Sequence, residues 1–561
     1  MRHRGHTILC GHSAARSAVD PGGNLVSAPE SVQIVTARRI VTMAGAEPPA
    51  FAMRGERIVA HGAVADLRGE FPAARLHDFG DATVIPGFND AHQHPTVVAA
   101  QSLQVDLSPS RISSTADLTA ALRERAAATP PGEWVIGCGY DSFRSNGGRE
   151  LTRAELDEAC PDHPVLVVHV TLHAGVVNSP GLALAGLTDW SEPPPGGHLG
   201  RDAAGRLDGV IHDQALYDLA FPAFTPRPTI VQDPSTEVLA AAFTRHAAAL
   251  HAAGITSVGD ALVGRTEWQV LRHLADQNQL TLRVNALAAY DHFDYFRALP
   301  GTPLAPETRL RLGGVKTFAD GAVNGGTCLV EQPIEGTDSY GLERVSAAQL
   351  ADTVRHVHDA GWRVCVHANG DRAIRRVLDA VDQAQAATPR EDPRHRIEHC
   401  SIIDDEILKR MRDHGMVAVP FANYAAAHGD KLTQYYGPER VERMFAHRSM
   451  LDAGVAVAGS SDHPCGPFPP LYALRSCVTR RAPDGELFGP SQRISVEAAL
   501  GVYTTGSAYA SGEEATKGQL APGFLADFAV LAEDPFAADP EALDRVRVRE
   551  TWVGGERVWS A

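Results

Sequence analysis

The sequence has few cysteines, no long apolar run and no excess of basic residues. Its 561 residues include eight cysteines, none of them in a Cys-x-x-Cys pair. This spacing indicates neither a disulfide framework nor a zinc ribbon, and it favours a reducing cytoplasm. No apolar run approaches the length of a membrane-spanning helix. The formal net charge of −17 would repel nucleic acid and anionic lipid, so we expect neither as a partner.

The overall composition is that of a soluble globular protein. Hydrophobic residues make up 44% of the chain and charged residues 21%. A chain of this length suits one large barrel together with a smaller domain. With nucleic acid and membranes disfavoured, we expect a small-molecule substrate, and we expect the protein to be a homo-oligomer such as a dimer.

The first thirty residues differ from the rest of the chain. Residues 1–30 place Arg2, Arg4 and Arg16 among small and polar residues, without the continuous apolar core of a secretion signal. We interpret this segment as a disordered extension or as the result of a start codon placed too early.

Both ends of the remaining chain are rich in short β-type runs separated by glycine turns. Such runs occur in residues 31–85 and again in residues 506–561, for example at 57–60 and 527–531. Two β-rich ends that flank one long segment predict a single small β-sandwich domain built from both termini.

Residues 86–505 alternate apolar strands with helical stretches. Ala-rich helical segments such as 237–253 and 347–360 lie between the strands. Steady alternation implies parallel pairing, and about eight such units predict an α/β fold of the (β/α)₈ barrel type. The strands that we assign to the barrel are 165–170, 254–258, 282–286, 312–318, 364–367, 396–399, 416–419 and 455–458.

Two histidines follow the apolar run that begins at Val84. Alternate residues of a strand point to the same side, so His92 and His94 can reach one metal ion together. The apolar run suits a buried parallel strand, and Pro86 and Gly87 supply a bend that frees its end. A His-x-His pair by itself is more often a surface or core feature, so ligands farther along the chain decide the interpretation.

Several later strands end in a residue type that binds metals. Histidine nitrogens together with a carboxylate suit a divalent ion such as zinc, with one position left open for water. Water on such an ion ionises near neutral pH, and an adjacent carboxylate can take up its proton, which is the chemistry of hydrolysis. An unmodified lysine is protonated at neutral pH, so a lysine ligand must be neutral or converted to an anion. The strand-end residues are Lys316, His367, His399 and Asp462.

Five motifs occur in a fixed order along the chain. They are His92-Gln93-His94 after Pro86-Gly87-Phe88, Val315-Lys316-Thr317-Phe318-Ala319-Asp320-Gly321, His367-Ala368-Asn369-Gly370-Asp371-Arg372-Ala373, Arg396-Ile397-Glu398-His399 and Gly459-Ser460-Ser461-Asp462-His463-Pro464. Together they resemble the amidohydrolase superfamily, and more narrowly its amidohydrolase-3 branch, which includes N-substituted formamide deformylases and many uncharacterised hydrolases. The resemblance covers nearly all of the chain after about residue 31.

The resemblance implies a distorted TIM barrel with a composite β-sandwich, and a divalent metal cofactor of one or two ions, with Zn²⁺ as the expected metal. In such enzymes a lysine at the fourth strand can be carboxylated by carbon dioxide to a carbamate that bridges two metals, and Lys316 occupies the matching motif. Asp462 would both touch the metal and act as general acid and base. The implied metal ligands are His92, His94, Lys316, His367, His399 and Asp462.

Two further residues are predicted to bind substrate. His173 lies in a segment that resembles the His-x-x-x-x-Asn-Ser segment of the branch, and Asp320 lies within the lysine motif. A helix-start or loop role is an equal alternative for His173. The chain departs from the usual pattern of the branch at residues 322–328 and at His463 and Cys465. We expect both segments on loops over the metal, where specificity is made.

The leading interpretation is a cytoplasmic, metal-dependent amidohydrolase that cleaves a carbon–nitrogen bond other than a peptide bond. An amide, N-acyl or N-formyl small molecule is the expected substrate, with metal-activated water as nucleophile. A second interpretation is deamination of a cyclic amidine, which uses one metal with a further histidine and glutamate; the Lys316 motif argues against it. A third is a non-catalytic barrel scaffold, which the loss of a ligand would support, but no expected ligand type is missing.

Overall fold

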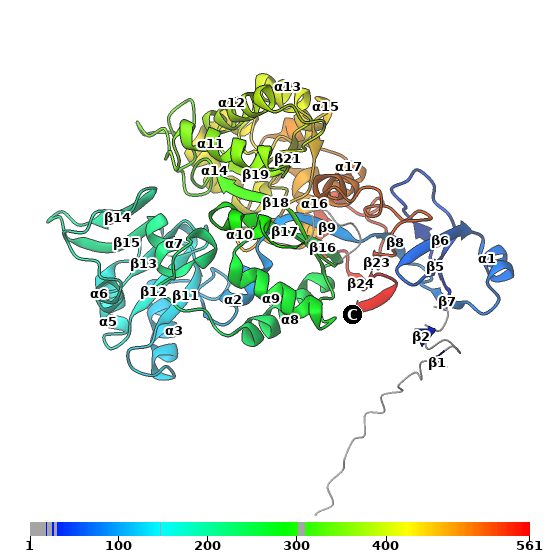
Figure 1. The fold of residues 1–561 in the computed structure, drawn as a ribbon, viewed down its shortest axis with the longest axis horizontal. Helices are drawn as coiled ribbons and strands as arrows, with labels where there is room; N and C mark the ends of the chain where they lie inside the picture. Colours follow the sequence, from blue (N-terminus) through cyan, green and yellow to red (C-terminus); the bar gives the residue numbers. More distant parts are fainter. Residues whose placement is uncertain (1–17, 20–24, 27–30, 146, 301–308) are drawn as a thin grey trace, which may run out of the picture.

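The computed structural model describes residues 18–19, 25–26, 31–145, 147–300 and 309–561. Most of the extension predicted for residues 1–30 therefore lies outside the described residues. Within it, β1 (Ala18–Val19) pairs antiparallel with β2 (Leu25–Val26). The rest of the chain forms a large central sheet with its helices, a second sheet at one end of the molecule and two smaller sheets at the other end (Figure 1).

The central sheet is the barrel that the alternating pattern predicts. Its eight strands pair in parallel in the order β22-β21-β20-β19-β18-β17-β16-β9. Their side chains are mostly buried, as expected for strands covered on both faces. The strands are β9 (Phe88–Gln93), β16 (Ile255–Val263), β17 (Arg283–Ala289), β18 (Leu310–Phe318), β19 (Val364–Ala368), β20 (Arg396–His399), β21 (Val417–Pro420) and β22 (Ala456–Val457).

Amphipathic helices cover the outside of this sheet, and several begin at a capping residue. Ser235 accepts a hydrogen bond from the amide of Val238 at the start of α8, and Ser346 and Gln349 form a capping box at the start of α11. The main helices are α8 (Thr236–Ala252), α9 (Arg265–Asp276), α10 (Phe293–Arg297), α11 (Ala347–Asp359), α12 (Asp371–Ala387), α13 (Asp405–Asp413), α14 (Tyr424–Val441), α15 (His447–Asp452), α16 (Pro470–Thr479), α17 (Val496–Gly501) and α18 (Ser507–Ser511).

The two edge strands of the central sheet, β9 and β22, meet through a short seam. The amide of Ala91 donates to the carbonyl oxygen of Gly459 at 2.9 Å, and the amide of Asp462 donates to the carbonyl oxygen of His92 at 2.9 Å. These two bonds join the first barrel strand to the segment that follows the last one. The seam thus brings a predicted histidine ligand and the predicted carboxylate together.

A second sheet of six strands is inserted between β9 and β16, in the order β10-β11-β12-β13-β15-β14. The assignment of residues 165–170 to the barrel was wrong, because these residues form β12 of this sheet; the first barrel strand is β9. A buried central strand reads as the same apolar run in either sheet, so periodicity does not tell them apart. The strands are β10 (Val105–Asp106), β11 (Val135–Tyr140), β12 (Val165–His169), β13 (Ala174–Val177), β14 (Gly197–Arg201) and β15 (Leu207–Asp213), with helices α2 (Pro95–Gln101), α3 (Thr115–Ala127), α4 (Ser142–Ser145), α5 (Arg153–Ala159), α6 (Ser179–Leu184) and α7 (Gln214–Ala220).

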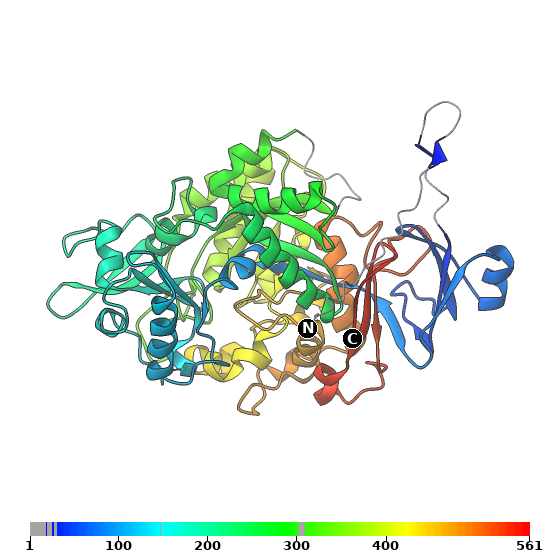
Figure 2. The same ribbon diagram turned by 90° about the horizontal axis from the view of Figure 1, so that it is seen from below.

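Strands from both chain ends share one five-stranded sheet, in the order β25-β24-β23-β8-β4. In it β23, from the C-terminal end, pairs antiparallel with β8, from the N-terminal end (Figure 2). A four-stranded sheet in the order β6-β5-β3-β7 lies next to it, and α1 (Val64–Glu70) follows β6. The strands are β3 (Gln33–Thr36), β4 (Arg39–Ile40), β5 (Ala50–Arg54), β6 (Arg57–Gly62), β7 (Arg75–Asp78), β8 (Thr83–Pro86), β23 (Phe528–Leu531), β24 (Val548–Val553) and β25 (Glu556–Ser560).

The apolar run before the two histidines is divided between two sheets. The run was expected to be one parallel strand, but β8 belongs to the five-stranded sheet and β9 to the barrel. Gly87 is the residue between them, and a Cβ atom there would lie 2.2 Å from Cγ2 of the buried Thr256. The close approach of these two sheets therefore leaves no room for a side chain at this position.

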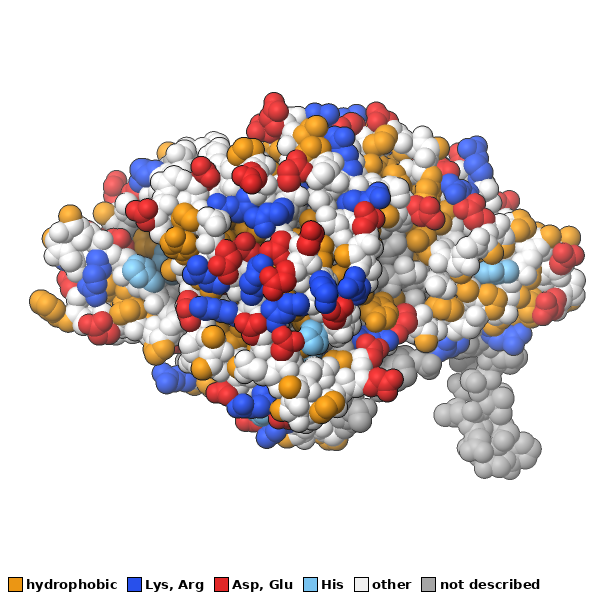
Figure 3. Space-filling model, turned by 90° about the horizontal axis from the view of Figure 1, so that it is seen from above, with side chains coloured by type: hydrophobic (Ala, Val, Ile, Leu, Met, Phe, Trp, Pro, Cys, Tyr) orange, Lys and Arg blue, Asp and Glu red, His pale blue; other side chains and the backbone are white. Residues whose placement is uncertain are grey.

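Two global features accompany this fold. Within the described ranges, no helix is both long and apolar enough to cross a membrane. On the face shown in Figure 3, acidic and basic side chains are interspersed over the central part of the molecule.

Candidate metal centre and pocket

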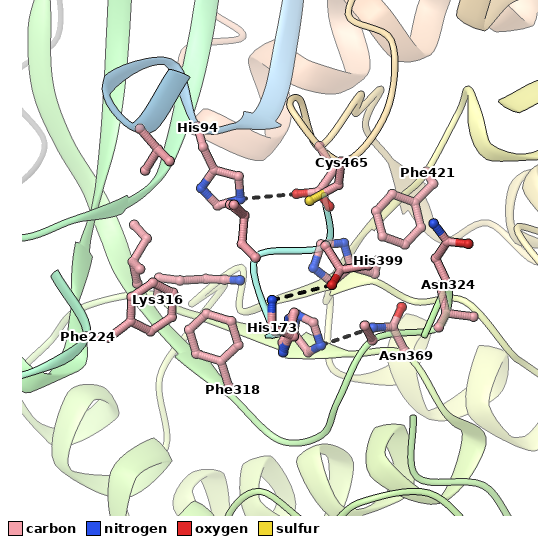
Figure 4. Close-up of a pocket in the computed structure, with 18 of the residues that line it drawn as sticks. His94, His173, Phe224, Lys316, Phe318, Asn324, Asn369, His399, Phe421 and Cys465 are labelled. Atoms are coloured by element: carbon pink, nitrogen blue, oxygen red, sulfur yellow. Dashed lines mark hydrogen bonds and ion pairs between the residues drawn. The ribbon is translucent and has the colours of Figure 1, made fainter. Parts of the chain in front are cut away.

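Three predicted ligands converge at the seam of the barrel. His92 is the last residue but one of the buried strand β9, His94 precedes α2, and Asp462 follows β22. Their ligand atoms all lie within 4.8 Å of one another, and the Nε2 atoms of both histidines lie 3.2 Å from Oδ1 of Asp462. All three side chains are buried (Figure 4 shows His94).

The donor set of this cluster fits a divalent cation. Nδ1 of His92 contacts the Glu398 carboxylate, which only accepts hydrogen bonds, so Nδ1 carries the hydrogen and the lone pair of a neutral ring lies on Nε2. That lone pair then faces an oxygen of Asp462, and two acceptors this close repel each other unless a positive charge lies with them. Histidine nitrogens and a carboxylate oxygen are the ligands that zinc and similar ions prefer.

Charged and polar neighbours keep the two carboxylates of the centre ionised. Burial by itself would raise the pKa of Asp462, but His399 and His94 hold that pKa well below its usual value. Burial would also raise the pKa of Glu398. Arg396 and His92 oppose this effect and hold the pKa of Glu398 well below its usual value.

Glu398 and Arg396 were not among the predicted site residues. Both lie on β20, two positions apart, so strand geometry places them on the same face as each other. Arg396 donates from Nε to Oε1 of Glu398 at 2.6 Å and from Nη2 to Oε2 at 2.8 Å. The alternation Arg-x-Glu directly before the predicted ligand His399 was the available signal.

His399 and His367 extend the cluster into the barrel mouth. The ring centroid of His399 lies 4.8 Å from that of His92 and 4.5 Å from that of His367. His399 has a left-handed φ of 72°, which turns the chain at the end of β20, and Phe421 stacks on its ring at 4.4 Å. Nε2 of His367 donates to the carbonyl oxygen of Gly321 at 3.1 Å, which leaves Nδ1 as the acceptor of that ring.

Lys316 lies near the end of β18 and points into the same cavity (Figure 4). Its side chain is 1% exposed, and Nζ lies 4.2 Å from the ring centroid of Phe318. Burial lowers the pKa of Lys316 to about 8. Within the described residues, Nζ of Lys316 makes no hydrogen bond or ion pair, which is unusual for a buried lysine.

His173 enters the pocket from the inserted sheet. It lies in the turn between β12 and β13, and its ring centroid is 5.5 Å from that of His367 (Figure 4). Nδ1 of His173 lies 2.7 Å from Oδ1 of Asp213, a residue that we had not predicted. Asp213 ends β15 with a left-handed φ of 47°, and no motif in the sequence marks it.

Asp320 lies away from the cavity. Its buried carboxylate accepts hydrogen bonds from the backbone amides of Leu329, Asn369 and Gly370, at 2.9 to 3.0 Å. Burial raises the pKa of Asp320 to about 7. These contacts hold two loops together, so the substrate-binding role predicted for Asp320 stays a prediction without geometric support.

Aromatic side chains form one wall of the pocket. Tyr217 stacks on Phe224 at 3.9 Å, and Phe224 lies 5.3 Å from Phe318. The guanidinium of Arg344 covers Phe318 at 4.1 Å from its ring centroid. Further lining residues are His94, Val97, Leu172, Phe221, Leu262, Ala322, Val323, Asn324, Phe421, Tyr424 and Cys465.

Comparisons with known proteins agree with this geometry. The amidohydrolase family model matches residues 75–559. The putative amidohydrolase YtcJ of Bacillus subtilis is 29% identical over 486 residues, which cover 85% of this chain and 89% of that protein. The N-substituted formamide deformylase of Arthrobacter pascens is 29% identical over 510 residues, covering 89% and 93%. An uncharacterised metal-dependent hydrolase from Pyrococcus horikoshii has the same fold, with a TM-score of 0.73, 22% identity and coverage of 91% and 99%.

Proposed function

The chain belongs to the amidohydrolase family and is a hydrolase of carbon–nitrogen bonds, and from this premise we propose that it cleaves an uncharged N-formyl or N-acyl amide at a metal centre. The observation that carries the proposal is the convergence of His92, His94 and Asp462, whose ligand atoms all lie within 4.8 Å of one another. The name of the formamide deformylase relative supports an amide as substrate.

Six side chains are proposed to hold one or two metal ions, with zinc as the proposed metal. The bound metal would lower the pKa of water and polarise the substrate carbonyl. The unpaired and buried Nδ1 atom of His399 and Nε2 atom of His92 support this assignment. The proposed ligands are His92, His94, Lys316, His367, His399 and Asp462.

Asp462 is proposed to move the proton during hydrolysis. Its carboxylate would take a proton from water as the water oxygen forms a bond to the carbonyl carbon, and would then give that proton to the amide nitrogen as the carbon–nitrogen bond breaks. The products are a carboxylic acid, formic acid for a formamide, and an amine. The position of Asp462 between two histidines in the pocket supports this role.

Lys316 is proposed to be carboxylated. Its neutral amine would add to carbon dioxide and release one proton, giving a carbamate whose two oxygens can bind metal. The buried position of Nζ in the cavity, without any hydrogen bond or ion pair from the described residues, supports this modification. The same position argues against deamination of a cyclic amidine, for which we expected no lysine in the centre.

The pocket wall supports a substrate with an aromatic or bulky apolar group. Tyr217, Phe224 and Phe318 offer ring faces, and Lys316 is the one lysine or arginine among the described lining residues. Arg344 lies over the ring of Phe318 but is not among the lining residues, so a free carboxylate on the substrate would lack a direct partner once Lys316 serves the metal. We propose that His173, held by Asp213, contacts the polar part of the substrate.

The test uses metal analysis with two matched amides. We expect the purified enzyme to contain a divalent metal and to hydrolyse N-phenethylformamide at least tenfold more efficiently than N-formylglycine. A chelator should remove metal and activity together, and zinc should restore both. A protein that retains full activity after complete removal of metal would contradict the proposal.

We also propose three features of the whole protein. Residues 31–85 and 506–561 would form a composite β-sandwich beside a barrel domain of residues 86–505, and Phe51 of one sheet contacts Phe528 of the other at 5.5 Å in support. The protein would be cytoplasmic, in keeping with seven free cysteines among the described residues. It would assemble as a homo-oligomer.

A further inference from the structure

An ion pair lies behind the metal centre, in the interior of the barrel. Arg396 and Glu398 are both fully buried, and the guanidinium binds the carboxylate with two hydrogen bonds of 2.6 and 2.8 Å. The same carboxylate contacts Nδ1 of His92, which is also fully buried. Three buried polar side chains thus form one chain of contacts that ends at a proposed metal ligand.

Arg396 holds the backbone of the neighbouring residue as well. Its Nη2 atom donates to the carbonyl oxygen of Ala91 at 3.0 Å. Strands β9 and β20 are not neighbours in the sheet, so these contacts cross the barrel interior. The guanidinium of Arg396 therefore holds two groups in place. One is the Glu398 carboxylate, which contacts the ring of His92, and the other is the backbone of Ala91, the residue directly before His92.

Stability alone does not explain a buried ion pair at this position. Removing two charges from water costs several kcal/mol per ion, and apolar residues of similar volume often stabilise a core equally well. Strand β20 could consist of apolar residues alone, as its neighbour β19 nearly does. A reason connected with the metal centre is therefore needed.

We propose that Arg396 and Glu398 are positioning residues that set the metal affinity of the centre by fixing the tautomer and orientation of His92; this inference rests on the metal site proposed above. The charged carboxylate keeps the hydrogen of His92 on Nδ1 and its lone pair on Nε2. It also increases the electron density that the ring offers to a cation. Arg396 keeps Glu398 directed at His92, because its two-pronged contact leaves the carboxylate no other orientation.

The direct test is the substitution Glu398→Gln, which keeps the size of the side chain but removes its charge. Zinc affinity is measured on the full-length apo-protein by competition with a chromophoric chelator. We expect the dissociation constant for zinc to rise by about 10- to 100-fold, the usual effect of losing a partner of a metal-binding histidine. The visible absorption bands of the cobalt-substituted protein should shift in the same variant.

A matched control separates metal affinity from general stability. Glu513 is another buried carboxylate in an ion pair, 2.7 Å from Lys517 and 3.4 Å from Arg311. Glu513→Gln should lower the melting temperature but leave zinc affinity and the cobalt spectrum as in the wild type. Arg396→Lys is the second test variant, since it keeps the positive charge but loses the two-pronged contact; we expect a smaller loss of affinity.

The possible results give distinct conclusions. Wild-type zinc affinity in Glu398→Gln, or in Arg396→Lys if the first variant does not fold, would overturn the inference and leave the proposed function standing. An equal loss in Glu513→Gln would also overturn it, because the effect would then be structural. A wild-type protein that takes up no divalent metal would overturn the metal site itself. Lost affinity in a protein that hydrolyses none of the amides would support the inference and contradict the proposed substrate class.

Discussion

The amide nitrogen of Asp462 donates a hydrogen bond to the carbonyl oxygen of His92 at 2.9 Å. Together with the bond from the amide of Ala91 to the carbonyl oxygen of Gly459, this backbone contact joins the segment after the last barrel strand to the end of the first. It also aligns the Asp462 carboxylate with the two histidine rings, each 3.2 Å away. Closure of the barrel and assembly of the proposed metal centre therefore share this contact.

Asp462→Asn is expected to abolish most turnover without unfolding the protein, because the amide has the size of the carboxylate but cannot accept a proton. Removing a general acid and base typically lowers the rate by about 10² to 10⁴-fold. Metal content is measured beside turnover: metal retained with activity lost indicates proton transfer, and both lost indicates ligation. Turnover near the wild-type rate would mean that both proposed roles are wrong.

Lys316→Ala is expected to lose metal and activity together, because the carbamate oxygens would no longer be present to bind the metal. Short carboxylic acids such as acetate or propionate should restore part of the activity by filling the vacated space. Phe318→Leu serves as the control for metal content alone, since it alters a side chain of the pocket wall and leaves the lysine. An experimental density map with an unmodified lysine pointing away from a metal-loaded centre would rule out the carbamate.

Asp213→Asn is expected to raise KM for the amide substrate roughly tenfold, equivalent to about 1.4 kcal/mol, because His173 would lose a charged hydrogen-bond partner. Metal content should not change. Asp208→Asn, on the same strand β15, is the control, because among the described residues the Asp208 carboxylate binds only the amide of Val210 in its own strand. Equal KM values for wild type and Asp213→Asn would remove His173 from the proposed substrate contacts.

Gly87→Ala is expected to destabilise the protein by about 1 to 3 kcal/mol, the usual effect of overpacking. The new Cβ would lie 2.2 Å from Cγ2 of Thr256, where the chain passes from β8 to β9. Gly69→Ala is the control, because that position in α1 has no atom within 4 Å and gains helix propensity. Chemical denaturation measures the free energy of unfolding of Gly87→Ala and of Gly69→Ala. Equal stability of the two variants would contradict the expectation.

Stability is expected to fall with pH below about 6.5, in part through His251. Burial lowers the pKa of His251 to about 4, and its ring donates to Ile255 O at 2.9 Å and accepts from Thr281 at 3.0 Å. Between pH 6.5 and 4 the unfolded chain binds a proton that the folded chain does not, so stability decreases by up to about 3 kcal/mol. The midpoint of urea denaturation is measured at several pH values, and it should depend less on pH in His251→Gln than in the wild type. The same pH dependence in both proteins would exclude a contribution from His251.

The sequence by itself predicted the parts of the protein that local patterns encode. The apolar periodicities identified strands and helices, for example 347–360, which is observed as α11, and the motif order identified the amidohydrolase family. Strand-end positions also marked His92 and Asp462 as candidate ligands, and the structure places Nε2 of His92 3.2 Å from Oδ1 of Asp462. These features depend on neighbours within a few residues, so the linear sequence carries them.

The tertiary structure alone decided which distant segments meet. Residues 165–170 joined the inserted sheet and not the barrel, because a buried strand has the same pattern in both. Glu398 contacts His92 across the barrel interior. Asp213 contacts His173 at the edge of the inserted sheet. Asp320 faces backbone amides, since the loops around it close on its carboxylate. Strand pairing and loop closure depend on contacts between residues that are far apart in the sequence, and these contacts form as the whole chain packs. No pattern within a short stretch of sequence predicts them.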